Sequence, residues 1–256
     1  MNAPIEVEVS LIEGIKQSRG EDDSLDFTVY YTIVNASASE TIALEAINEE
    51  VNKKYNIALS AVKKADGNTN NLFDKRNEHL DGCYQAIVSY KKACMDRKRM
   101  ENDIEARYDV ARAIMRNNIG EKYAIFHESI FGIERLNEMC MSEGIKPHIY
   151  HSGMELSEDQ ALQYPELDTP AFRKRLKQYA KDAPKHLQRW TDSSSDFLLT
   201  CKSLKEGFDV PDMDGVVMIT GTNSVRSRIQ TIGRVFRGRK HKKVFMLIRL
   251  RGSCSS

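Results

Sequence analysis

The chain has 256 residues, of which 41% are hydrophobic and 29% are charged, and its formal net charge is +1. This length allows one large domain or two modest ones, and the composition is that of an ordinary soluble protein. No run of about 18 apolar residues and no basic-then-apolar leader occurs, so we expect no membrane span, no signal peptide and a cytoplasmic location.

The first part of the chain predicts one strand followed by helices. Residues 1–26 are acidic and weakly patterned, whereas residues 27–35 are rich in aromatic and β-branched side chains and predict a strand. The capping box Ser37-Ala-Ser-Glu40 predicts the start of a helix that continues to about Lys64. Glycine and asparagine then predict a loop, after which helical spacing resumes. This loop and the helices after it are expected at residues 66–71, 78–95 and 97–117.

From Lys122 the pattern changes to short apolar strands that alternate with helices. This alternation predicts βαβ units and therefore a parallel sheet with right-handed crossovers. The strands are expected at residues 123–127, 147–151, 196–201, 215–220 and 243–248. The helices between them are expected at residues 130–142, 172–190 and 224–237.

The five cysteines are odd in number, widely spread and never arranged as Cys-x-x-Cys. This usage argues against a disulfide framework and against a zinc site, so we predict buried thiols and no bound metal. The cysteines are Cys83, Cys94, Cys140, Cys201 and Cys254.

The near-neutral total charge hides an asymmetry along the chain. From Gly215 to the end there are ten Lys or Arg and no Asp or Glu, which leaves 28 basic and 37 acidic residues before this point. A basic block of this kind raises the local anion concentration and suits phosphate binding. The alternative interpretation is a solvated basic surface or tail.

The helix expected over residues 224–237 has two distinct faces at about 100° per residue. Its apolar residues collect on one face, which can anchor the helix against a sheet. The other face carries two arginines and is left free to meet an anion. The apolar face contains Val225, Ile229, Ile232 and Phe236, and the arginine face contains Gln230, Gly233, Arg234 and Arg237.

Two segments of this region carry a resemblance to a known family. The segment Gln230-Thr-Ile-Gly233-Arg234-Val-Phe-Arg237 resembles motif VI of superfamily 2 helicases and DNA translocases. The segment Glu206-Gly207-Phe-Asp209-Val-Pro211 resembles their motif V, at the spacing expected before motif VI. Ser224 lies six residues before Gln230. This spacing resembles the Ser-x-x-x-x-x-Gln-x-x-Gly-Arg form of motif VI in the restriction-enzyme and phage-type, DEAD/DEAH-like branch. Residues 124–127 and 150–154 resemble the motif IV region and the segment that follows it.

The resemblance implies a fold and a division of the chain. Residues 120–256 would form the second RecA-like lobe of a helicase core, an α/β domain with a parallel sheet flanked by helices. Residues 1–119 would form a mainly helical linking region, with one strand followed by helices. In this family ATP lies between two RecA-like lobes, of which the second supplies arginines.

The resemblance also assigns roles to single residues. Arg237 is the expected arginine finger and Arg234 the second phosphate contact, since a guanidinium can neutralise charge on the γ-phosphate as its bond breaks. Nucleotide contacts are expected at Gln230, Gly233, Gly207 and Asp209. Nucleic-acid contacts, with DNA as the expected ligand, are assigned to Thr200, Cys201, Lys202, Ser203 and Ser129. Cys201 stands where many relatives have a threonine that contacts the nucleic-acid backbone.

One half of an ATP site has no counterpart among these residues. No Gly-x-x-x-x-Gly-Lys-[Ser/Thr] phosphate loop occurs, and no Asp-Glu-x-Asp or Asp-Glu-x-His follows an apolar strand. We therefore expect ATP with Mg²⁺ to bind only when a Walker A-containing RecA-like lobe completes the site, from the same full-length protein or from another chain. Alone, the chain is expected to be inactive in ATP hydrolysis.

Three interpretations stay open from the sequence. The first is the carboxyl-terminal half of a superfamily 2 ATP-dependent helicase or translocase, either cut from a longer protein or part of a split protein. The second is a non-catalytic nucleic-acid-binding or adaptor module with a RecA-like fold, which would bind through the basic block. The third is an α/β domain without a phosphate loop whose basic helix is merely solvated.

Overall fold

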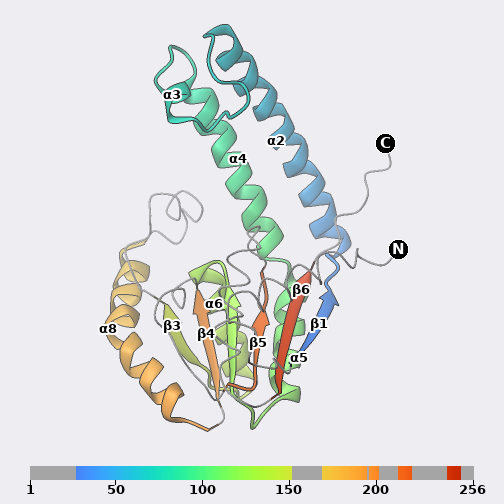
Figure 1. Ribbon diagram of the computed structural model, residues 1–256, viewed down its shortest axis with the longest axis vertical. Helices are drawn as coiled ribbons and strands as arrows, with labels where there is room; N and C mark the ends of the chain where they lie inside the picture. The colour runs from blue at the N-terminus through green and yellow to red at the C-terminus, as the bar shows by residue number, and fades with distance from the viewer. Residues whose placement is uncertain (1–26, 152–168, 195, 202–212, 221–240, 249–256) are drawn as a thin grey trace, which may run out of the picture. The chain divides into compact units, whose positions relative to one another are not determined.

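The computed structural model describes residues 27–151, 169–194, 196–201, 213–220 and 241–248 (Figure 1). The chain divides into two compact units. The helical unit comprises residues 36–104 and 156–173, and the sheet unit comprises the rest of the chain. These units follow contacts between residues rather than chain order, and the domain boundary predicted at residue 119 stays a prediction.

The sheet unit is built on six strands in the order β1-β6-β5-β2-β4-β3, and every neighbouring pair is parallel. The predicted α/β fold class with a parallel sheet is therefore confirmed, and each described strand ends within two residues of its expected bounds. The strand predicted within the linking region is β1, an edge strand that joins the sheet through β6. The strands are β1 (Phe27–Ile33), β2 (Tyr123–His127), β3 (His148–His151), β4 (Phe197–Cys201), β5 (Gly215–Met218) and β6 (Lys242–Ile248).

Helices lie on both faces of the sheet (Figure 1). Alternate residues of the strands, among them Ala124, Leu198 and Val216, pack in one buried cluster with Trp190 of helix α8 (Pro170–Asp192). The opposite face is covered by α5 (Glu105–Asn117) and α6 (Ile130–Ser142). This burial on both faces explains why the strands are continuously apolar rather than alternating.

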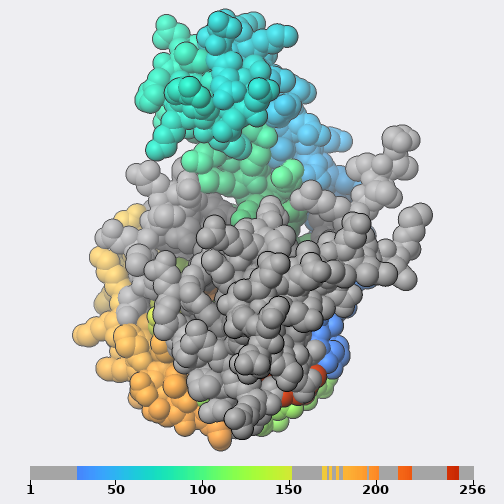
Figure 2. All heavy atoms as spheres, in the orientation of Figure 1, coloured from blue at the N-terminus to red at the C-terminus, as the bar shows by residue number. Residues whose placement is uncertain are grey.

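The helical unit is formed by α2 (Ala38–Lys64), α3 (Lys75–Glu78) and α4 (Tyr84–Asn102). Figure 2 draws the atoms of these helices in blue to green. The predicted capping box is confirmed, because the Ser37 N–H donates to Glu40 Oε2 at 2.7 Å and the Glu40 N–H donates to Ser37 Oγ at 3.2 Å. The helix predicted from residue 78 begins only at Tyr84, because a turn with Gly82 at φ 74° precedes it.

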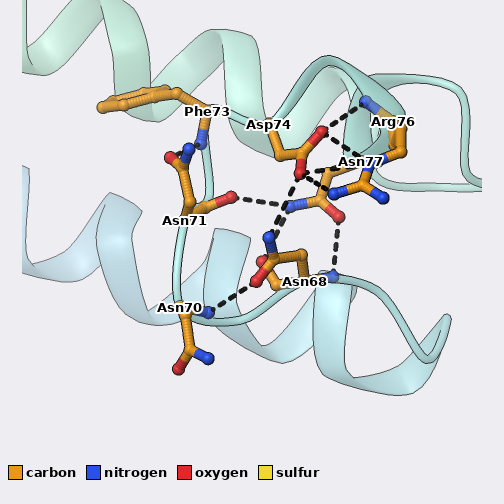
Figure 3. Close-up of polar contacts among 7 residues, drawn as sticks. All are labelled: Asn68, Asn70, Asn71, Phe73, Asp74, Arg76 and Asn77. Carbon is orange, nitrogen blue, oxygen red and sulfur yellow. Dashed lines mark hydrogen bonds and ion pairs between the residues drawn. The ribbon is translucent and has the colours of Figure 1, made fainter.

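The loop between α2 and α3 is organised by one buried amide (Figure 3). The Asn77 Nδ2 group donates to the carbonyls of Asn68 at 2.9 Å and Asn71 at 3.0 Å, and Asn77 Oδ1 accepts from the Asn68 N–H at 2.9 Å. The Asn68 side chain donates in turn to Asp74, whose pKa is held well below its usual range by hydrogen bonds from Arg76. The predicted loop at residues 66–71 is thus confirmed.

Among the helices that the structure describes, none is long and apolar enough to cross a membrane.

Candidate functional site at the carboxyl edge of the sheet

The candidate site lies where the chain leaves two neighbouring strands in opposite directions. After β2 the chain passes through α6 to β3. On this side of β2 the neighbouring strand is β4, and β3 lies beyond it. β5 lies on the other side of β2, and the strand after it, β6, lies further to that side. The carboxyl ends of β2 and β5 therefore form a topological switch point, the place where open α/β sheets bind ligands.

The backbone of Glu128 ties three strand ends together at this point. Its N–H donates to the Thr220 hydroxyl, just after β5, at 2.8 Å, and its carbonyl accepts from the Cys201 thiol, at the end of β4, at 3.1 Å. All three residues are at most 7% exposed. We call this arrangement the Glu128 bridge. In the sequence, residues 202–212, which contain motif V, follow Cys201, and residues 221–240, which contain motif VI, follow Thr220. We call these stretches the motif V segment and the motif VI segment, and both follow one bonded unit.

The end of β5 is fixed by further bonds from two other elements. The Ile219 N–H donates to the carbonyl of Phe126 in β2 at 3.0 Å. The buried guanidinium of Arg107, in α5, donates through Nη1 to the carbonyl of Ile219 and to that of Leu247 in β6, the latter at 3.0 Å. Arg107 thus joins the two strands between which residues 221–240 run, with charge-assisted hydrogen bonds.

The start of α6 is shaped around the His127 ring. The Ser129 N–H donates to His127 Nδ1 at 3.0 Å, and the ring stacks on Tyr108 with a centroid distance of 5.8 Å. The Ser129 hydroxyl caps the helix by accepting from the Gly132 N–H at 2.9 Å. A Cβ on Gly132 would lie 2.1 Å from His127 Cε1, so only glycine fits against the ring.

A second buried histidine lies at the end of β3. His151 Nε2 is 4.0 Å from Glu134 Oε1, and both side chains are buried. Burial lowers the pKa of His151 to about 4, so its imidazole is neutral at physiological pH. We assign no chemical role to either histidine.

Three of the residues predicted to contact nucleic acid lie at this edge, and all three are buried. The Ser129 hydroxyl caps α6 and the Cys201 thiol belongs to the Glu128 bridge. Thr200 points to the opposite face of the sheet from Cys201 because neighbouring residues of a strand alternate. The Thr200 hydroxyl is buried and has no hydrogen-bond partner among the described residues. Binding of nucleic acid by these residues stays a prediction.

The other predicted site residues lie outside the described residues, so their roles stay predictions as well. They are Lys202, Ser203, Gly207, Asp209, Gln230, Gly233, Arg234 and Arg237. What the structure does bring together is the pair of strand ends from which their two segments leave.

Several residues of the edge were not found from the sequence. Glu128 acts through its backbone, which leaves no signal in residue type. In the sequence, Arg107 is one of several charged residues in a predicted helix, and nothing indicates that its hydrogen bonds span 112 and 140 residues. Gly132, a glycine in the first turn of a predicted helix, was the available signal of a close approach.

The fold and the switch point define a RecA-like α/β domain, and the sequence comparisons give its family. Residues 106–239 match the helicase conserved C-terminal domain, and the chain belongs to this family. Comparison with curated protein sequences finds no significant match.

Solved structures show the same fold at low sequence identity. The C-terminal part of the Fun30 ATPase domain is 10% identical with a TM-score of 0.50, over 88% of this chain and 86% of that chain. The Sulfolobus solfataricus SWI2/SNF2 ATPase C-terminal domain is 11% identical with a TM-score of 0.49, over 88% and 80%. The SWI2/SNF2 ATPase core of the same organism, in complex with dsDNA, is 12% identical with a TM-score of 0.49, over 90% and 42%. Together with the family match, the Fun30 structure shows that the chain has the RecA-like fold of a helicase C-terminal domain.

Proposed function

We propose that the chain is the second RecA-like lobe of a superfamily 2 ATP-dependent helicase or translocase and works on ATP held by a first lobe. The observation that supports this most is the position of the motif segments. Both lie within the family match at residues 106–239, and they follow the ends of β4 and β5, which flank β2 and are tied together by the Glu128 bridge. Two segments that must act on one nucleotide are thereby given a common origin.

The proposed chemistry is carried by arginines. Arg237 acts as the finger that neutralises charge on the γ-phosphate oxygens, and Arg234 makes the second phosphate contact. An arginine finger contributes on the order of 10³ to 10⁵ to the rate of phosphoryl transfer. Gln230, Gly233, Gly207 and Asp209 are assigned to the nucleotide by motif alone.

The first lobe supplies the phosphate loop and the Mg²⁺ ligands in this proposal. The reason is that neither a Walker A segment nor an Asp-Glu-x-Asp or Asp-Glu-x-His segment occurs in these 256 residues. Within the described part of the chain, no group of three or more His, Cys, Asp or Glu could hold a metal ion. Mg²⁺ held by the first lobe would supply positive charge to the phosphates, and the arginines proposed here would add to that charge.

The nucleic acid is proposed to be DNA, contacted near the carboxyl end of β4 and by the basic block. The structure narrows which basic residues are available. Lys242 is buried and its Nζ donates to the Met213 carbonyl, while Lys243 Nζ pairs with Glu121 at 2.9 Å. The other eight Lys and Arg after Gly215 lie outside the described residues. Two of them, Arg234 and Arg237, are assigned to ATP, and we assign the remaining six to phosphate contacts with DNA.

Substitution of Arg237 tests the function in the chain completed by its Walker A-containing lobe. Arg237→Ala should lower kcat for ATP by about 10³-fold or more while DNA affinity is unchanged, because the finger acts on the transition state. Arg239→Ala, an arginine two residues beyond the motif, is the matched control and should keep kcat when DNA is saturating. Loss of DNA binding with intact turnover in Arg237→Ala would reject the finger assignment.

The basic block supports a second candidate function, a non-catalytic nucleic-acid-binding module. In that case DNA affinity would fall steeply with salt and would be the same with or without nucleotide and the first lobe. Fluorescence anisotropy of labelled duplex DNA across a salt series, with and without ATP and that lobe, separates the two functions. A dependence of affinity on nucleotide in the completed enzyme favours the helicase lobe.

A further inference from the structure

Ile219 and Thr220, the two residues immediately before the motif VI segment, are held by hydrogen bonds from three other elements. Ile219 donates to the Phe126 carbonyl and accepts from Arg107, and the Thr220 hydroxyl accepts from the Glu128 N–H. Three elements, β2, α5 and the turn after β2, therefore fix two consecutive residues. The chain continues directly from Thr220 into residues 221–240.

The same residue that holds Thr220 also holds the start of the motif V segment. Glu128 donates through its N–H to Thr220 at 2.8 Å and accepts through its carbonyl from Cys201 at 3.1 Å. A displacement of Thr220 must therefore either break a buried hydrogen bond or move Glu128, and with it the partner of Cys201. The bridge mechanically links the origins of the two segments.

We propose that Thr220 is a positioning residue whose hydroxyl sets the origin of the motif VI segment and couples it, through Glu128, to the origin of the motif V segment. The proposal rests on the function proposed above, because it concerns the placement of that function's arginines. Thr220 touches neither the nucleotide nor the nucleic acid in this proposal. It acts through the backbone of Glu128.

The chemistry of the contact makes the hydroxyl oxygen the essential atom. A backbone N–H that is buried without an acceptor carries a large desolvation penalty. Valine has nearly the shape of threonine but offers no acceptor, so Thr220→Val removes the hydroxyl that accepts from the Glu128 N–H and favours a shifted backbone. Thr220→Ser keeps the acceptor and loses only a methyl group.

The kinetic test compares these two variants in the completed enzyme. Thr220→Val should lower kcat for ATP by about 10- to 100-fold with KM little changed, since misplacement by about 1 Å has costs of this size and the nucleotide is held by the first lobe. Thr220→Ser should restore kcat to within about threefold of the unchanged enzyme. Equal kcat in Thr220→Val and the unchanged enzyme, or no restoration by serine, would overturn the proposal.

Thr191→Val is the matched control, with the same chemical change far from the bridge. The Thr191 hydroxyl donates to the Leu187 carbonyl within α8, at 2.9 Å, and is exposed. This variant should leave kcat and KM unchanged. A loss of kcat in Thr191→Val equal to that in Thr220→Val would show a general effect of removing a hydroxyl and would overturn the proposal.

Amide hydrogen exchange on the chain alone separates this proposal from the proposed function. Thr220→Val should speed exchange of the Glu128 amide and of peptides from residues 219–240, with Thr220→Ser close to the unchanged chain. If the completed enzyme hydrolyses no ATP, the proposed function fails, and unchanged exchange in Thr220→Val would reject the positioning role separately.

Should Thr220→Val not fold, Cys201→Ala removes the other side of the bridge. Faster exchange after residue 201 would then support the bridge, and unchanged exchange would reject it.

Discussion

The two units of the chain satisfy their buried polar groups in opposite ways. In the loop of the helical unit, Asn77 bonds to residues six to nine positions away. At the carboxyl edge of the sheet unit, the Glu128 bridge joins residues 73 and 92 positions apart, and Arg107 reaches across 112 and 140. The loop is a local structure that its own sequence can specify, whereas the edge exists only when the whole sheet has formed.

This difference suits the function proposed for the edge. The tertiary fold places the ends of β4 and β5 relative to one another, and the proposed function needs such a common reference for two motifs that act on one nucleotide. A local loop gives no such coupling between distant segments. Changes at the edge should therefore affect the whole sheet unit, and changes in the loop should stay within the helical unit.

The largest effect is expected from Gly132→Ala. The new Cβ would lie 2.1 to 2.4 Å from three atoms of the His127 ring, with Tyr108 behind it, so the free energy of unfolding should fall by about 3 kcal/mol or more. Urea unfolding followed by circular dichroism measures this. Gly82→Ala, at φ 74° with open space around its Cβ, should cost only about 1–2 kcal/mol. Equal costs at the two positions would break the comparison.

The next effect is a loss of stability in acid through His151. Its pKa is lowered to about 4 in the folded chain, against an ordinary value of about 6.5, so the unfolded chain binds the proton first. This stability is complete above about pH 6.5 and is lost as pH falls towards 4, by up to about 3 kcal/mol. Burial also lowers the pKa of His186, which adds in the same direction. Unfolding in urea between pH 4.5 and 7.5 should show a smaller slope for His151→Gln, and an unchanged slope would contradict the account.

A smaller and local effect is expected from Asn77→Ala. The change removes three hydrogen bonds of the buried amide and should cost about 2 kcal/mol, seen as faster amide exchange over residues 66–80. Asn70→Ala is the control, because its side chain is exposed and points away from the cluster (Figure 3). Faster exchange at the ends of β2, β4 or β5 in Asn77→Ala would contradict the local character of the loop.

The smallest effect concerns the start of α2. Ser37→Ala removes the hydrogen bonds of its hydroxyl to Glu40 and Ser39 and should cost about 1 kcal/mol, while Ser37→Asp keeps an acceptor and should cost a few tenths of a kcal/mol. Amide exchange over residues 38–44 measures it. An effect as large as that of Asn77→Ala would show that the cap is not a local feature.

The sequence predicted the parts of the fold that depend on local pattern. Apolar strands, the capping box at Ser37 and the loop at residues 66–71 follow from spacing and residue type, and all are confirmed. The order of the strands and the place of β1 beside β6 did not follow, since they depend on contacts more than 200 residues apart. The motifs predict a site at the carboxyl ends of these strands, and that assignment stays a prediction. The Glu128 bridge could not be predicted from the sequence, because every residue type has a backbone carbonyl and nearly every one a backbone N–H.

The central claim is that this chain holds only one half of an ATP site, and the rate of ATP hydrolysis by the chain alone tests it most directly. Phosphate release should be measured with Mg²⁺ and duplex DNA, first without and then with the Walker A-containing lobe. The account predicts no hydrolysis above background for the chain alone and DNA-stimulated hydrolysis once that lobe is added. DNA-stimulated hydrolysis by the chain alone would contradict it.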